Sequence, residues 1–108
     1  MKQQRPELLL GKTIHKKTGC GSLYITVNKF ENKPFEIFIT GAKSGVCNQV
    51  MCASLGVIMS LYLRNGCDWE ELVKSLKGIT CNMQGDFKSC TDAIAKAIEE
   101  SMSVEEIV

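Results

Sequence analysis

The stretch GSLYITVNKFENKPFEIFIT, residues 21–40, decides the fold, because it contains two alternating apolar patterns separated by a short polar break. The alternating apolar residues are Leu23, Ile25 and Val27 in the first half and Phe35, Ile37 and Ile39 in the second. A period of two is typical of a strand with one buried face. The polar residues 31–33, followed by Pro34, predict a short loop, so we expect an antiparallel hairpin.

A third strand is predicted upstream of the hairpin, over residues 10–18. Its two sides would consist of Lys12, Ile14 and Lys16 on one and Thr13, His15 and Lys17 on the other. The pattern does not decide which side faces the core.

Downstream of Gly45 the apolar period changes from two residues to three or four. The recurring residues are Cys47, Val50, Met51, Ser54, Val57, Ile58 and Leu61. This spacing predicts a helix whose apolar stripe lies against the sheet. Gly66 is a natural stop for this helix, because glycine commonly follows the last helical residue.

Two shorter helices are predicted beyond this stop. Asp68 and Glu71 have the spacing of a capping box ahead of an apolar run, and their helix is expected to end near Gly78. The third helix is expected to begin after Cys90, with the negative charge of Asp92 in its first turn. Its apolar face would consist of Ala93, Ile94, Ala97 and Ile98.

Length and composition agree with a single domain over residues 1–108. Strands followed by helices indicate an α+β fold, with a small antiparallel sheet of N-terminal strands and about three helices packed on one face. No apolar run approaches about 18 residues and no signal pattern is present, so we expect a cytoplasmic protein without membrane contact. The near-neutral balance of 13 Lys plus Arg against 12 Asp plus Glu argues against a nucleic-acid partner.

Charge is nevertheless distributed unevenly along the chain. Basic residues dominate the first twenty positions, where Glu7 is the one acidic residue, whereas the last ten positions hold four glutamates and no base. Because so few charges are involved, a solvated basic strand and an acidic helix end are the favoured interpretation over a polyanion site.

Cysteine placement is the most informative chemical feature. Four cysteines lie at boundaries between predicted elements, where the backbone can present a thiolate: Cys20, Cys47, Cys81 and Cys90. Four thiolates could hold one tetrahedral Zn²⁺, but the short C-x₂₋₄-C spacing that identifies a zinc site is missing. By spacing alone, reduced buried thiols are favoured. Cys52, in mid-helix, and Cys67, near a helix start, are expected to be packing residues.

A second candidate site is the connection TGAKSG, residues 40–45, between the hairpin and the long helix. Its Gly41, Lys43, Ser44 and Gly45 could offer backbone N–H groups and a positive charge to a phosphate or carboxylate. The order of residues in a P-loop is missing. A simple connection with Ser44 as the helix N-cap is therefore the favoured interpretation.

No catalytic residue is predicted. His15 is the one histidine, so a Cys-His pair would require it to meet a thiol that the sequence does not place beside it. A surface imidazole is the favoured interpretation. Tyr62 and Trp69 are expected to pack where two helices meet.

Five ordered blocks of the sequence resemble the TSCPD domain family. They are GCGSLYITVN (19–28), PFEIF (34–38), KSGVC (43–47), LKGITC (76–81) and SCTDAIAKA (89–97). The likeness covers about residues 9–100. This domain lies near the C-terminus of cobalamin-dependent (class II) ribonucleotide reductases and also occurs as short stand-alone proteins.

The resemblance implies that four cysteines share one metal site, with zinc as the metal that four thiolates suit best. The family positions are those of Cys20, Cys47, Cys81 and Cys90. The family pattern does not call for cysteine at the positions of Cys52 and Cys67. Two departures concern the turns beside the ligands, because Thr91 replaces the name-giving proline and Val46 replaces a glycine.

The resemblance also implies an accessory role. A radical-generating reductase barrel needs several hundred residues, so this chain should neither bind cobalamin nor reduce ribonucleotides alone. We expect a stand-alone, zinc-binding module that binds a partner such as a reductase or another nucleotide-metabolism protein. One alternative is a nucleotide-like small-molecule binder that uses loop 40–45, with contacts in a homo-oligomer completing its pocket. A thiol redox protein is a further alternative, disfavoured because no C-x-x-C is present.

Overall fold

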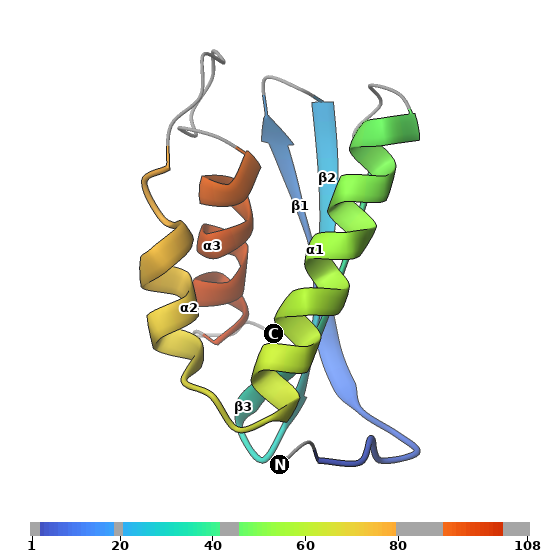
Figure 1. The fold of residues 1–108 in the computed structure, drawn as a ribbon, viewed down its shortest axis with the longest axis vertical. Helices are drawn as coiled ribbons and strands as arrows, with labels where there is room; N and C mark the ends of the chain where they lie inside the picture. Colours follow the sequence, from blue (N-terminus) through green and yellow to red (C-terminus); the bar gives the residue numbers. More distant parts are fainter. Residues whose placement is uncertain (1–2, 19–20, 42–45, 80–89, 103–108) are drawn as a thin grey trace.

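The computed structural model describes residues 3–18, 21–41, 46–79 and 90–102, with the backbone alone described for residues 46–48. Within these ranges the α+β prediction is confirmed (Figure 1). The elements are β1 (Leu10–Thr18), β2 (Gly21–Phe30), β3 (Lys33–Gly41), α1 (Val46–Arg64), α2 (Trp69–Leu76) and α3 (Cys90–Ser101). The strands form one antiparallel sheet in the order β1-β2-β3.

The predicted hairpin joins β2 to β3 through a turn shorter than expected. Glu31 and Asn32 both have positive φ, 54° and 65°, as the central residues of a type I′ turn require. Lys33, which we had placed in the loop, already pairs with Phe30 in the sheet. A two-residue turn of this type matches the right-handed twist of the strands, which explains why the strand begins one residue early.

The core lies on one face of the sheet. On the central strand β2, Leu23, Ile25 and Val27 are almost completely buried. Their neighbours on the same face are Ile14 of β1 and Ile37 and Ile39 of β3. This register settles the facing of β1, because Ile14 lies opposite Ile25 and so points to the core.

The helices cover that face in two parts. Helix α1 runs along β3, whereas α3 packs on β1 and β2 and α2 lies against α3 (Figure 1). The apolar face predicted for α3 is confirmed, since its alanines and isoleucines are buried in the core. Tyr62 and Trp69 both pack against the core where α1 meets α2, and the Tyr62 hydroxyl donates to the carbonyl of Asp68 at 2.9 Å.

The apolar stripe predicted to bury α1 points outward, so that prediction is wrong. Its exposed fractions are 56% for Val50, 68% for Met51, 60% for Val57, 63% for Ile58 and 41% for Leu61. The opposite side of the helix is the buried one, and it carries Cys52, Leu55, Gly56, Met59 and Leu63. Because α1 is apolar on two sides, its period alone could not show which side meets the sheet.

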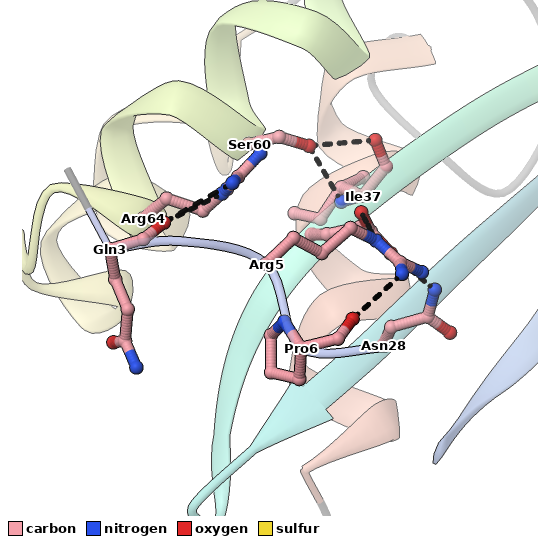
Figure 2. Close-up of polar contacts among 8 residues, drawn as sticks. Gln3, Arg5, Pro6, Asn28, Ile37, Ser60 and Arg64 are labelled. Carbon is pink, nitrogen blue, oxygen red and sulfur yellow. Dashed lines mark hydrogen bonds and ion pairs between the residues drawn. The ribbon is translucent and has the colours of Figure 1, made fainter. Parts of the chain in front are cut away.

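Two small residues of α1 decide which side is buried. Gly56 lies so close to β3 that an added Cβ would sit 3.0 Å from the carbonyl oxygen of Ile37. One turn further along, the Ser60 hydroxyl accepts from the Ile37 N–H at 2.9 Å and donates to the Ile37 carbonyl at 3.1 Å (Figure 2). Ser60 thus satisfies both edge groups of Ile37, which would otherwise be free for another strand.

The N-terminal segment ties the end of α1 to the sheet (Figure 2). Gln3 exchanges hydrogen bonds with Arg64, its N–H donating to the Arg64 carbonyl at 2.8 Å. The Arg5 guanidinium donates twice to the buried Glu36 carboxylate, at 2.8 and 3.0 Å, and Asn28 adds a third donor at 2.9 Å. Part of the basic N-terminal charge is therefore paired inside the fold.

We expect Ser60→Ala to destabilise the protein by about 1–2 kcal/mol, because both backbone groups of Ile37 lose their partner. Ser75→Ala is the matched control, since the Ser75 hydroxyl is exposed and bonds only within its own helix, and it should change stability by less than about 0.5 kcal/mol. Urea unfolding of the two variants measures the difference. Equal midpoints would contradict the role assigned to Ser60.

We expect the Glu36 carboxylate to make stability depend on pH in the acid range. Hydrogen bonds from Arg5, and then from Asn28, hold the pKa of Glu36 below its ordinary value of 4.5. Because the pKa of Glu36 is lower in the folded state, its ionised carboxylate stabilises the fold above about pH 4.5. This stabilisation is lost as the pH falls through the folded pKa. Thermal unfolding from pH 7 to pH 3 should show a steeper loss for the wild type than for Glu36→Gln. Parallel curves would exclude this contribution.

Candidate functional site

Elements that border three of the predicted cysteine ligands, Cys20, Cys47 and Cys90, meet at one end of the molecule. The end of β1, the start of β2, the start of α1 and the start of α3 all lie at the upper end in Figure 1. The end of β3 belongs to the same region, because Gly41 pairs with Leu23 near the start of β2. The fold thus gathers element boundaries that are up to 72 residues apart in sequence.

Of the four predicted ligands, Cys90 is the one whose side chain the structure describes. It begins α3 and is half-buried, and its Sγ lies 3.6 Å from Oγ1 of Thr18 at the end of β1. The Thr18 hydroxyl also donates to the carbonyl of Gly21 at 3.0 Å, across the connection between β1 and β2. The thiol of α3 therefore lies beside the end of β1, at a residue two positions before Cys20 in the sequence.

The other predicted metal ligands are described in part or not at all. Cys47 lies in the first turn of α1, where only its backbone is described, and Cys20 and Cys81 lie outside the described residues. Within the described ranges, no three potential ligands come together. The four-cysteine site is therefore still a prediction.

The loop proposed for an anion falls mostly outside the described residues, which exclude Lys43, Ser44 and Gly45. Gly41 is described and has a φ of 113°, which L side chains rarely adopt. A Cβ added there would lie 2.4 Å from the carbonyl oxygen of Ser22, so glycine is required by the close approach of β2. The pairing of strands accounts for Gly41 without a ligand.

Cys52 is closer to the candidate site than its sequence position indicated. It lies on the buried side of α1, in the same cluster against which Cys90 packs. Burial raises the pKa of the Cys52 thiol, and the charge of Cys90 raises it further. The sequence pattern that could have indicated the burial of Cys52 is the second apolar side of α1, which includes this residue. The prediction of a packing residue is therefore confirmed for Cys52 and is wrong for Cys67, which is exposed.

Asp92 positions the start of α3. It lies in the first turn of α3, as predicted, and its side chain is only 1% exposed. One carboxylate oxygen accepts from the N–H of Gly78 at 2.8 Å, and the other accepts from the Lys96 ammonium at 3.0 Å. The carboxylate therefore links the end of α2 to the first turn of α3, two residues from Cys90.

His15 lies away from these thiols on the outer face of the sheet. Its ring stacks on Tyr24 with 4.8 Å between the ring centroids, and its Nε2 is 3.0 Å from the Ser22 hydroxyl. The prediction of a surface imidazole is confirmed.

In the ranges that the structure covers, no helix combines the length and the apolar character needed to span a bilayer.

Comparison with known proteins gives one match. A family model described as the TSCPD domain matches residues 1–102, which is nearly all of the chain. No curated protein and no solved structure matches the chain.

The two cysteines outside the predicted site should differ in reactivity. We expect a maleimide to modify Cys67 in the folded protein and to modify Cys52 at least about tenfold more slowly, because Cys52 is buried and its thiol pKa is raised. Peptide mass spectrometry over time measures both rates. Modification of Cys52 at the rate of Cys67 would show that the buried side of α1 is assigned wrongly.

Proposed function

Because the chain belongs to the TSCPD domain family, we propose that it acts as a zinc-stabilised accessory module that binds a protein partner. The metal ligands would be Cys20, Cys47, Cys81 and Cys90. The observation that carries the proposal is the position of the Cys90 thiol beside Thr18, at the end of the fold where β1 ends and β2, α1 and α3 begin (Figure 1).

The described part of the site suits a structural metal. Cys90 is half-buried, and Asp92 holds the helix turn that carries it. Among the described residues its Sγ has the Thr18 hydroxyl as a hydrogen-bond partner, and a sulfur that takes part in one such bond can still bind a metal. Thiolates select zinc over the hard cations, which prefer oxygen.

Bound zinc would supply metal–sulfur bonds between parts of the chain that are far apart in the sequence. In sequence, Cys20 belongs to the β1–β2 connection, Cys47 to the first turn of α1, and Cys90 to the first turn of α3. A shared ion would therefore link the sheet to both helix layers. Such links stabilise a small domain, whose core buries a modest share of its surface.

The proposed partner is a protein of nucleotide metabolism, with class II ribonucleotide reductase as the candidate that the family resemblance implies. The described polar groups at this end hold the fold together. Thr18 and Asp92 hydrogen-bond within the fold, and the one histidine lies on the outer face of the sheet. The nucleotide-binding alternative gains no support, because the described Gly41 is explained by strand pairing.

We expect the purified protein to contain about one zinc per chain, measured by elemental mass spectrometry. Serine substitution at any of the four proposed ligands should abolish the stoichiometric metal, because three thiolates hold zinc much less firmly than four. Cys67→Ser is the matched control and should retain the metal, since Cys67 is exposed and lies outside the proposed set. A chelator should lower the thermal midpoint of the wild type and of this control.

A metal-free protein whose thermal midpoint is unaffected by chelator would contradict the zinc site. The partner is tested separately, by titrating the zinc-loaded chain with a purified class II reductase in a calorimeter. Saturable binding supports the accessory role. A chain that holds zinc but binds no reductase would contradict the proposed partner and leave the metal site standing.

A further inference from the structure

Helix α1 presents an apolar face to solvent that the sheet does not use. We define this α1 outer face by six residues, which are Val50, Met51, Ser54, Val57, Ile58 and Leu61. Its five apolar members are between 41% and 68% exposed. When a helix is apolar on two sides and its own domain covers only one of them, the helix is expected to lie between two layers.

The outer face has the size of an interaction surface. Side chains of this kind, roughly half exposed, present on the order of 500 Å² of apolar surface, which is the upper end of what monomeric proteins expose in one patch. A stable interface buries about 800 Å² on each partner. The groove beside this face, lined by Ala53, Phe38 and Arg64 among others, would supply much of the remainder.

The spacing on the outer face matches a helix as its occupant. Val50, Ser54, Val57 and Leu61 follow one another at steps of four, three and four residues. These are the steps of the seam along which two helices pack side by side. Ser54 lies near the middle of the face, and its small side chain allows a second helix to approach closely.

Charge favours a second copy of this chain as that occupant. Arg64 is the one charged residue in the 19 residues of α1, and it is engaged at the end of the helix with Gln3 and the ring of Phe35. A face without charge cannot select an oppositely charged partner, but it can pair with itself without repulsion. A two-fold axis near Ser54 would place Val50 of one copy beside Ile58 of the other, with the two helix dipoles antiparallel.

We propose that the chain forms a two-fold symmetric dimer through the α1 outer face. Extension of the sheet beyond β3, the edge strand beside α1, is not the mode, because Ser60 hydrogen-bonds both edge groups of Ile37 and Pro34 lacks an N–H on the same strand. The interface lies along α1 from Val50 to Leu61, beyond the first turn that holds Cys47. Dimer formation is therefore separate from zinc binding and goes beyond the proposed function.

The test is the molar mass of the full-length protein, measured by light scattering during gel filtration at micromolar concentrations. We expect the wild type to elute with twice the chain mass of 11.9 kDa. Ile58→Glu should elute as a monomer, because the dimer would bury two unpaired carboxylates. Leu8→Glu is the matched control, since Leu8 is 78% exposed and lies outside α1, and this variant should remain a dimer.

Two further measurements make the outcome specific. Circular dichroism and zinc content should be the same for Ile58→Glu and the wild type, which separates loss of the dimer from loss of fold or metal. In a Cys67→Ser background, Ser54→Cys should form an intermolecular disulfide under mild oxidation, whereas Ser75→Cys should not. A monomeric wild type, a dimeric Ile58→Glu, or equal cross-linking of the two cysteine variants would overturn the proposal.

Discussion

Burial of one face of the central strand is the constraint on which the rest of the structure depends. Leu23, Ile25 and Val27 of β2 have exposed fractions of 0–1%, although a three-stranded sheet cannot cover its own face. Each such side chain contributes roughly 1.5–3 kcal/mol when removed from water, so the helices must pack over them. Helix α1 covers the β3 side and α3 covers the β1 side, and their placement follows from this requirement (Figure 1).

The two ends of the sheet are held by different chemistry. At one end, Arg5 and Asn28 satisfy the buried Glu36 carboxylate, and Gln3 ties the N-terminal segment to Arg64 (Figure 2). At the other end, Cys90 meets Thr18 where strands and helices begin or end. Hydrogen bonds and an ion pair stabilise the first end, and the proposed zinc would stabilise the second. The α1 outer face lies between the two ends and depends on neither these hydrogen bonds nor the proposed zinc.

Local signals in the sequence predicted most of the fold. The hairpin, the stop at Gly66 and the N-cap at Asp68 depend on neighbouring residues, and the structure confirms each of them. The uneven charge was visible too, but its pairing was not. Lys16 of β1 forms an ion pair with Glu100 of α3, which lies 84 residues away, so no local pattern could join them.

The sequence by itself determined the order of strands and helices, the approximate positions of their ends, and the boundary positions of the four candidate ligands. Only the tertiary structure decided which side of α1 is buried, that Cys52 lies in the cluster beside Cys90, and that Asp92 is enclosed. The physical reason is the range of the interactions. Periodicity and capping act over a few residues, whereas burial depends on which distant surfaces meet, as Gly56 and Ser60 meet the edge of β3.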